Sequence, residues 1–269
     1  MCWIFLERDD DMENLYKNSA WLYDLDNRDI VGDDIPFYIE YAKQQRSFGD
    51  ILELGCGTGR VATALAKEGF NVTGLDLSHD MLGIFREKLA SNDGKGKITL
   101  VHGDVANFDL GRKFDMIIVP FRVFQLLTDD DDVVSTLACI REHLDDSSIF
   151  IVNVFDPIVP MDEENWCRPE FVQWERFDEA MGNHVVKKVV QDKIDMANQI
   201  IYPRFIFEIT DADGRTQRVV DEFKMKYYFY DQLREVIEAA RLTICEEFSW
   251  YDKTPIPGRE LIFVCKKSS

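Results

Sequence analysis

The first half of the chain alternates short apolar runs with stretches in which apolar residues recur at helical spacing. The pattern predicts strands at Ile51–Leu54, Asn71–Leu75, Ile98–Val101, Phe114–Val119 and Ile149–Val154. It predicts helices at Ile35–Gln45, Arg60–Glu68, His79–Ala90 and Asp131–His143. Strands that are apolar along their length and alternate with helices are typical of a parallel sheet covered on both faces. With right-handed crossovers, this part of the chain forms a doubly wound α/β domain.

The pattern changes after Pro157, where apolar and polar residues begin to alternate. Strands are predicted at Phe171–Phe177, His184–Lys193, Ile200–Thr210 and Arg218–Tyr228, with turn residues between them. In the last of these, Val219, Phe223 and Met225 share one face, which is typical of a half-exposed antiparallel sheet. A helix at Asp231–Ala240 and strands at Leu242–Phe248 and Leu261–Cys265 follow.

These elements predict two units. Residues 1–160 and 229–269 are expected to form a Rossmann-like domain with a mostly parallel seven-stranded sheet that ends in an antiparallel hairpin. Residues 161–228 are expected to form an inserted antiparallel β-meander that covers this domain as a lid.

Charge limits the partners of this protein. The 269 residues include 50 Asp and Glu against 31 Lys and Arg, a formal net charge of −19. Proteins that bind nucleic acid need basic residues to displace the counterions of the phosphates, so nucleic acid is excluded as a partner. The acidic runs at 9–11 and 129–132 indicate a solvated end and the start of a helix.

Cysteine and histidine usage argues against disulfide and metal frameworks. The 6 cysteines include no C-x-x-C pair, and the 4 histidines lack metal-ligand spacing. The chain shows neither a secretory signal pattern nor an apolar run of the roughly 20 residues that a membrane helix needs. We therefore expect a cytoplasmic protein without a metal centre and without a membrane partner.

The most informative segment runs from Glu53 to Arg60. Three glycines alternate here, Gly55, Gly57 and Gly59, between a predicted strand and a predicted helix, and glycine permits close approach of a ligand to the backbone. The dinucleotide fingerprint needs glycine or alanine where Arg60 stands, and the phosphate-binding P-loop needs a lysine that this segment lacks. A cofactor other than a dinucleotide or nucleoside triphosphate is therefore indicated.

Three acidic residues stand close to the carboxyl ends of the first three strands. Glu53 precedes the first glycine by two residues, a position that suits a cationic ligand better than a pyrophosphate. Asp76 ends the second strand, where a carboxylate can accept both ribose hydroxyls. Asp104 follows the third strand and is placed to accept a hydrogen bond from an exocyclic amine. The carboxyl ends of parallel strands lie on one rim of the sheet, so these acids should lie near one another.

These motifs together resemble the class I S-adenosylmethionine-dependent methyltransferases, over about residues 50–155. The resemblance implies that Glu53 and the glycines hold the methionine end of the cofactor, Asp76 the ribose, and Asp104 with Val105 the adenine. The cofactor-binding residues that it implies are Tyr23, Glu53, Gly55, Cys56, Gly57, Thr58, Gly59, Asp76, Leu77, Met81, Asp104, Val105 and Pro120.

The meander and an N-terminal Tyr23-Asp24 pair are similar to features of small-molecule N-methyltransferases, including those acting on amino sugars and on glycine. Tyr23, Arg122 and Gln125 are the candidate catalytic residues. Tyr23 is expected either to face the sulfonium or amine by cation–π attraction or to pack a helix on the sheet. Arg122 is expected to pair with a substrate carboxylate or with the acidic N-terminal region. The sugar-modifying members have a histidine in the loop after the fourth strand, where this chain has Arg122 and Gln125.

The sequence thus predicts methyl transfer from S-adenosylmethionine to a small-molecule acceptor, with an amine nitrogen favoured. Three alternatives stay open at this level: a small-molecule O-methyltransferase, an NAD-dependent oxidoreductase, and a non-catalytic cofactor-binding protein. The chain is expected to act as a monomer or a homodimer, because an exposed edge of the meander could pair with a second subunit.

Overall fold

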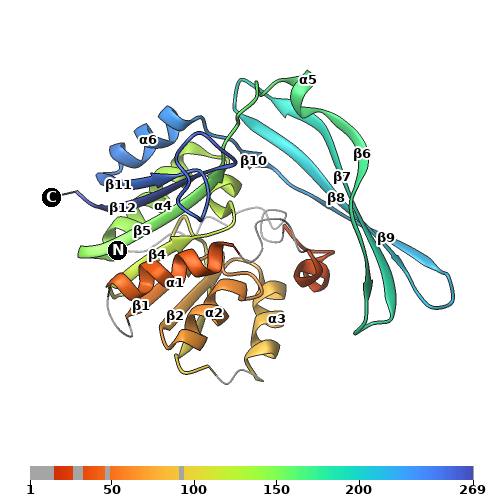
Figure 1. The fold of residues 1–269 in the computed structure, drawn as a ribbon, viewed down its shortest axis with the longest axis horizontal. Helices are drawn as coiled ribbons and strands as arrows, with labels where there is room; N and C mark the ends of the chain where they lie inside the picture. The colour runs from red at the N-terminus through yellow and green to blue at the C-terminus, as the bar shows by residue number, and fades with distance from the viewer. Residues whose placement is uncertain (1–14, 27–32, 46–48, 91–93, 269) are drawn as a thin grey trace, which may run out of the picture.

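The computed structural model describes residues 15–26, 33–45, 49–90 and 94–268, and it contains two sheets (Figure 1). The larger has seven strands in the order β11-β12-β5-β4-β1-β2-β3. Its strands are β1 Asp50–Leu54, β2 Asn71–Asp76, β3 Ile98–His102, β4 Phe114–Val119, β5 Leu144–Phe155, β11 Leu242–Phe248 and β12 Glu260–Lys267. Strands β1 to β5 are parallel, while β12 is antiparallel to β5 and to β11. The predicted sheet and its terminal hairpin are therefore confirmed.

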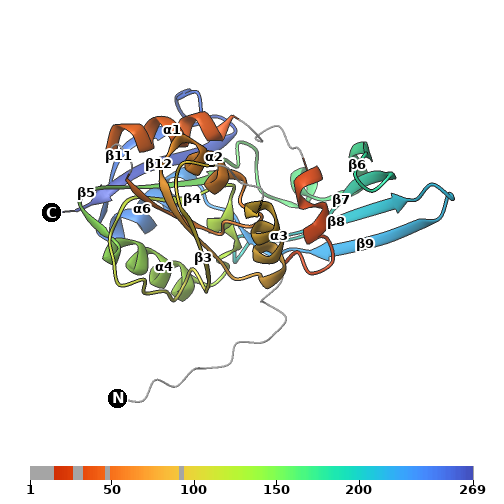
Figure 2. The same ribbon diagram turned by 90° about the horizontal axis from the view of Figure 1, so that it is seen from below.

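Helices cover both faces of this sheet. They are α1 Asp34–Gln45, α2 Arg60–Glu68, α3 His79–Leu89, α4 Asp130–Glu142 and α6 Tyr230–Ala239. Apolar side chains of α1, α2 and α3 form one buried cluster with the sheet, and those of α4 and α6 form another on the opposite face. Figure 2 shows the two helical layers on either side of the strands. The order of the strands changes direction between β1 and β4, which is where ligands bind in open α/β sheets.

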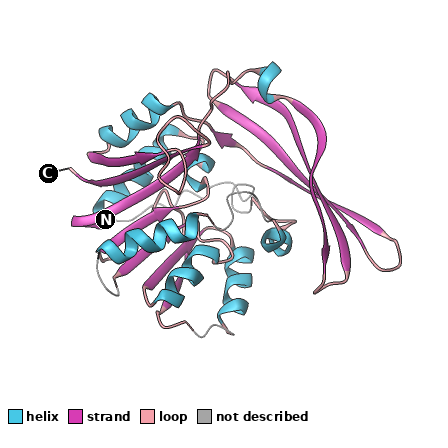
Figure 3. Ribbon diagram, viewed as in Figure 1, coloured by secondary structure: helices cyan, strands magenta, loops and turns pink. Residues whose placement is uncertain are grey.

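The second sheet projects away from the first as an extended arm (Figures 1 and 3). Its strands are β6 Arg168–Asp178, β7 Asn183–Asp195, β8 Ile200–Thr210, β9 Thr216–Glu222 and β10 Met225–Lys226, and the short helix α5 Glu163–Trp166 precedes them. All pairings within it are antiparallel. We refer to this sheet, residues 168–226, as the lid sheet.

One predicted strand is divided in the structure. The sequence pattern predicts a continuous strand at Arg218–Tyr228, but β9 ends at Glu222 and β10 begins at Met225. The gap faces Pro203 of β8, whose carbonyl accepts a hydrogen bond from Phe223 N at 3.0 Å. Proline has no N–H to return to the ladder, so the pairing breaks at this point and the chain bends.

Residues 15–26, which we call the N-terminal strap, lie between the lid sheet and the main domain. The strap contains the 3₁₀ helix η2, Ala20–Leu25. Leu22 is fully buried against Val185 and Phe207 of the lid sheet. On the other side, Asp24 accepts a hydrogen bond from Thr58 Oγ1 at 2.7 Å and pairs with Lys88 of α3. The strap therefore ties the lid sheet to the loop that follows β1.

Candidate active site

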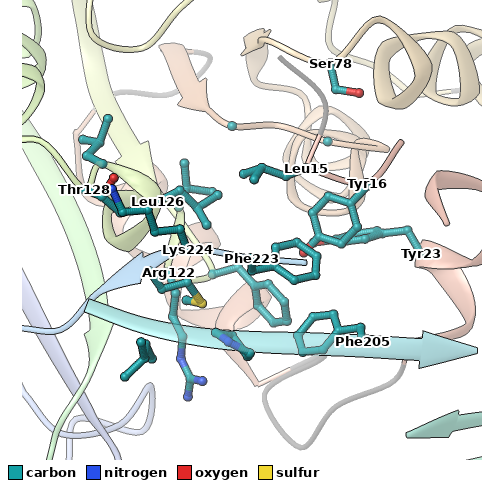
Figure 4. Close-up of a pocket in the computed structure, with 18 of the residues that line it drawn as sticks. Leu15, Tyr16, Tyr23, Ser78, Arg122, Leu126, Thr128, Phe205, Phe223 and Lys224 are labelled. Carbon is teal, nitrogen blue, oxygen red and sulfur yellow. The ribbon is translucent and has the colours of Figure 1, made fainter. Parts of the chain in front are cut away.

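A cavity of about 550 Å³ lies between the carboxyl ends of β1 to β5 and the lid sheet. The main domain contributes loop residues that follow these strands, among them Gly57, Asp76, Asp104 and Phe121. The strap and the lid sheet form the other wall (Figure 4). The cavity thus stands at the point where the strand order reverses, as the topology requires.

The glycines of the loop after β1 have different physical roles. Gly59 has φ +84°, and a Cβ there would lie 2.1 Å from the ring of Phe85, so packing alone demands glycine. Gly57 has φ +54°, but a Cβ there would meet no protein atom within 4 Å. Gly57 lines the cavity, so the open space beside it is space that a ligand can enter. This is the close backbone approach that the sequence predicts.

Asp76 links the glycine loop to the next strand. Its carboxylate accepts hydrogen bonds from Gly57 N at 2.7 Å and from Ser78 N at 2.8 Å, and the residue lines the cavity. Burial raises the pKa of this carboxyl, and the two backbone N–H groups oppose that rise. A carboxylate offers about four lone-pair sites, so the geometry leaves acceptor capacity for two ribose hydroxyls.

Asp104 lies in the loop after β3, the strand next to β2, which ends at Asp76. Its Oδ1 accepts a hydrogen bond from Ala106 N at 2.8 Å, which orders the loop, and the residue lines the cavity together with Val105. An acid and an apolar side chain side by side can accept a hydrogen bond from an amine-bearing heterocycle and contact its ring.

Glu53 lies behind the glycine loop and does not line the cavity. It is 2% exposed, and its Oε2 has no hydrogen-bond partner. Burial raises the pKa of Glu53 to about 8, against the lowering effect of Arg60. Arg60 itself is held by Asp34 through two hydrogen bonds of 2.7 and 2.6 Å.

We expect the Glu53→Gln variant without cofactor to gain stability relative to wild type as the pH rises. The folded-state pKa lies above the ordinary value of 4.5, so wild-type folding loses free energy between pH 4.5 and about 8, while glutamine does not titrate. The difference in unfolding free energy should be near zero at pH 4.5 and on the order of 4 kcal/mol at pH 8. Urea unfolding across this range measures it. A difference that does not change with pH would show that Glu53 is not buried as an acid.

The loop after β4 carries two consecutive residues in the left-handed region, Phe121 with φ 57° and Arg122 with φ 67°. Left-handed geometry costs a non-glycine residue roughly 1–2 kcal/mol, so other contacts must hold this turn. Arg122 supplies one, because its guanidinium pairs with Glu260, which is fully buried and also accepts from Asn153 Nδ2 at 3.0 Å. Phe121 and Arg122 both line the cavity.

The structure gives Arg122 and Gln125 partners that the sequence does not indicate. Arg122 pairs with Glu260 of β12, and its guanidinium lies 5.5 Å from the ring centroid of Phe155. The pairing that the sequence suggests with the acidic N-terminal run falls on residues outside the described ones. Gln125 is fully buried in the 3₁₀ helix η3, Val123–Leu126, and does not line the cavity. Its amide donates to Lys226 O at 2.9 Å and accepts from Phe155 N at 3.0 Å, so it joins the main domain to β10.

Eight of the sequence-predicted cofactor residues line the cavity: Tyr23, Gly55, Gly57, Asp76, Leu77, Met81, Asp104 and Val105. The other predicted residues, Glu53, Cys56, Thr58, Gly59 and Pro120, do not. Thr58 instead holds the strap through Asp24. Of the three candidate catalytic residues, Tyr23 and Arg122 line this cavity and Gln125 does not.

Sequence reasoning missed most of the lid wall. The residues not anticipated include Tyr16, Trp166, Gln173, Val189, Gln191, Ile201 and Lys224. Tyr16 stands seven positions before Tyr23, and the two rings meet edge-on with centroids 5.0 Å apart. The seven-residue spacing of these two tyrosines, which corresponds to two helical turns, could have indicated that both rings lie on the same side of the chain.

S-adenosylmethionine fits the residues on the main-domain side. Gly57 leaves its backbone open to a ligand, Asp76 retains acceptor capacity on the rim, and Glu53 presents an unpartnered buried oxygen behind the loop. Among the residues that the structure describes, no group of three or more His, Cys, Asp and Glu side chains could hold a metal ion. No helix within the described ranges is both long enough and apolar enough to span a membrane.

Comparisons with known proteins agree with this geometry. Residues 51–147 match a family model described as a methyltransferase domain. Over 146 residues the chain is 29% identical to the dTDP-3-amino-3,4,6-trideoxy-alpha-D-glucopyranose N,N-dimethyltransferase of Streptomyces venezuelae, covering 49% of this chain and 58% of that protein. The chain spans 55% and 58% of the length of the first curated relatives it matches.

Two solved structures share the fold over nearly the whole chain. An S-adenosylmethionine-dependent methyltransferase from Clostridium acetobutylicum has a TM-score of 0.77 at 20% identity, with 93% of this chain and 98% of that one covered. DesVI of Streptomyces venezuelae has a TM-score of 0.73 at 20% identity, with 98% and 100% covered. The chain therefore carries a methyltransferase domain at residues 51–147 and shares its overall fold with S-adenosylmethionine-dependent methyltransferases.

Proposed function

We propose that this protein transfers a methyl group from S-adenosylmethionine to an amine nitrogen of a small molecule. The observation that supports this most directly is the continuity of the cavity. It extends from Gly57 and Asp76 on the cofactor rim to Phe205 and Met225 of the lid sheet, so one continuous space would border both reactants. The Streptomyces venezuelae relative, whose name describes an N,N-dimethyltransferase, supports nitrogen as the acceptor atom.

The chain's own residues would orient the reactants and exclude water. S-adenosylmethionine supplies a methyl group on a positively charged sulfur, so transfer forms one N–C bond, breaks one S–C bond and leaves the charge on nitrogen. Asp76 and Asp104 would hold the nucleoside end, and the glycine loop, with Glu53 buried behind it, the methionine end. Tyr23 and Phe121 contribute aromatic rings to the cavity lining, and aromatic rings can attract positive charge. Positioning of this kind can account for a large share of the rate.

The lining favours nitrogen over oxygen. A neutral amine needs no base before attack, whereas an alcohol needs one placed within hydrogen-bond reach. The part of the lining that the structure describes contains no histidine, and Arg122 is already paired with Glu260. This arrangement supports an amine acceptor and makes an O-methyltransferase the second choice.

The experiment is a methyl-transfer assay with S-adenosylmethionine and panels of primary amines, phenols and alcohols, read by product mass. We expect products heavier by one or two methyl groups from amines alone. Calorimetry with S-adenosylmethionine and with NAD is the parallel measurement. Cofactor binding without any methylated product would favour a non-catalytic role, and binding of NAD alone would favour an oxidoreductase.

Three further features stay predictions from the sequence. They are the division into a 1–160 plus 229–269 domain with a 161–228 lid, a cytoplasmic location, and a monomeric or homodimeric state. Strand β6 lies at an edge of the lid sheet and is exposed along most of its length, which leaves it open to pairing with a second copy.

A further inference from the structure

Aromatic rings follow one another along the lid wall of the cavity. Tyr23 and Tyr16 have ring centroids 5.0 Å apart, Tyr16 and Phe223 are again 5.0 Å apart, and Phe223 and Phe205 are 4.5 Å apart. We call these four residues the aromatic row. All four line the cavity, and Figure 4 shows their rings gathered between the strap and β8.

The remainder of this wall is also largely apolar. Phe155 and Trp166 stack with centroids 6.4 Å apart and planes inclined by 12°, and both line the cavity. Val189, Ile201 and Met225 also line the cavity. The polar groups contributed by β6 and β7 are the uncharged amides of Gln173 and Gln191.

Charges in this half of the cavity offset one another. Apart from Asp76 and Asp104 on the cofactor rim, the described charged residues of the lining are Arg122, Asp132 and Lys224. The charge of Arg122 is compensated by the fully buried Glu260. Asp132 and Lys224 have opposite signs, so the described residues of the acceptor half carry no net positive charge.

This composition discriminates between classes of amine. A nucleoside diphosphate needs several guanidinium, ammonium or backbone N–H donors, and removing it from water without them is costly. An amine on an apolar body instead gains from burial of its carbon surface and, when protonated, from attraction to the aromatic faces.

We propose that the methyl acceptor is an amine carried on an uncharged apolar ring or chain, an arylalkylamine or alicyclic amine, that lies against the aromatic row. This rests on the proposed function. It sets the acceptor apart from the nucleotide-linked amino sugar in the name of the Streptomyces venezuelae relative.

Trp166 provides a binding signal that is independent of catalysis. The full-length protein, saturated with S-adenosylhomocysteine, is titrated with 2-phenylethylamine and separately with a nucleoside diphosphate-linked amino hexose. We expect saturable change in tryptophan emission with 2-phenylethylamine, and a Kd at least tenfold higher for the nucleotide-linked sugar. Trp166→Phe should lose the change in tryptophan emission, which would place the bound amine at this ring. Tighter binding of the nucleotide-linked sugar would overturn the proposal.

A matched pair of substitutions tests the aromatic row. Phe205→Leu should raise the Kd for 2-phenylethylamine three- to tenfold and leave the Kd for S-adenosylhomocysteine within twofold. Phe177→Leu makes the same change on the lid sheet at a residue that is 62% exposed and does not line the cavity, and it should change neither. Equal effects of the two variants would show that the acceptor does not contact the row.

Product mass separates failure of this inference from failure of the proposed function. Methylation of the apolar amine supports both. Methylation of only the nucleotide-linked sugar overturns the acceptor class and leaves methyl transfer to amines standing. Absence of any methylated amine, in protein shown by calorimetry to bind the cofactor, overturns the proposed function and the acceptor class together.

Discussion

Replacing Asp76 with alanine is expected to weaken S-adenosylmethionine binding at least about a hundredfold while the protein stays folded. The carboxylate accepts hydrogen bonds from Gly57 N at 2.7 Å and from Ser78 N at 2.8 Å. Its loss therefore loosens the glycine loop and also removes the acceptor for the ribose hydroxyls. A hydrogen bond to a charged group contributes about 1.5–3 kcal/mol, and two such bonds correspond to a factor of a hundred or more. Calorimetry measures the affinity, and near-ultraviolet circular dichroism reports the fold.

A second variant and a control variant test whether the loss of cofactor affinity arises at this rim. Gly57→Val places a branched side chain at φ +54° in the open space beside the loop, and it should also abolish binding. Asp80→Ala removes an exposed acid from the first turn of α3, outside the cavity lining, and should leave the affinity within twofold. If Asp76→Ala and Gly57→Val both bind as tightly as wild type, the cofactor does not occupy this rim.

The main domain was predictable because its signals are local. The helix Arg60–Glu68 and the strands Phe114–Val119 and Leu242–Phe248 have the bounds that the sequence pattern predicts. In each of these elements, the spacing of the apolar residues and the residues at the two ends indicate the same type of element and the same bounds. The positions of Asp76 and Asp104 could be predicted for the same reason, because parallel strands place their carboxyl ends on one edge of the sheet.

The missed features depend on partners distant in sequence. Arg122 and Glu260 are separated by 138 residues, and nothing near Arg122 in the sequence indicates which acid it meets. The break between β9 and β10 arises across the sheet, at Pro203. That proline was a readable signal, because it lies inside a predicted strand and has no N–H to offer its neighbour.

Lys187 is a second residue from which a long-range contact could have been predicted. Alternation along β7 places it on the same face as Val185 and Val189, which are both buried. Lys187 is itself 0% exposed. A lysine on an apolar face requires a buried acid opposite it. The acid is Asp26 of the strap, 161 residues away, which also accepts from Trp174 Nε1 at 2.9 Å.

We expect Lys187→Met to lower the free energy of unfolding by about 3–5 kcal/mol, because it leaves the Asp26 carboxylate buried without its counter-charge. Urea denaturation measures the change. Lys188→Met is the matched control on the neighbouring position of β7. Its lysine pairs with Glu170 and Glu208 at a partly exposed site, and its loss should lower the free energy of unfolding far less than Lys187→Met does.

The double variant Asp26→Asn with Lys187→Met distinguishes an unpaired buried charge from simple loss of packing. Asparagine keeps an acceptor for Trp174 and carries no charge, so the double variant should recover most of the stability that Lys187→Met loses. Cofactor affinity supplies a second readout, because the strap that this pair anchors carries Tyr16 and Tyr23 into the cavity. Lys187→Met should weaken S-adenosylmethionine binding under conditions where it remains folded, and the double variant should restore it in part. A double variant no more stable than Lys187→Met would mean that the lysine stabilises the strap through its aliphatic chain and the rings of Phe205 and Phe207, with the charge secondary.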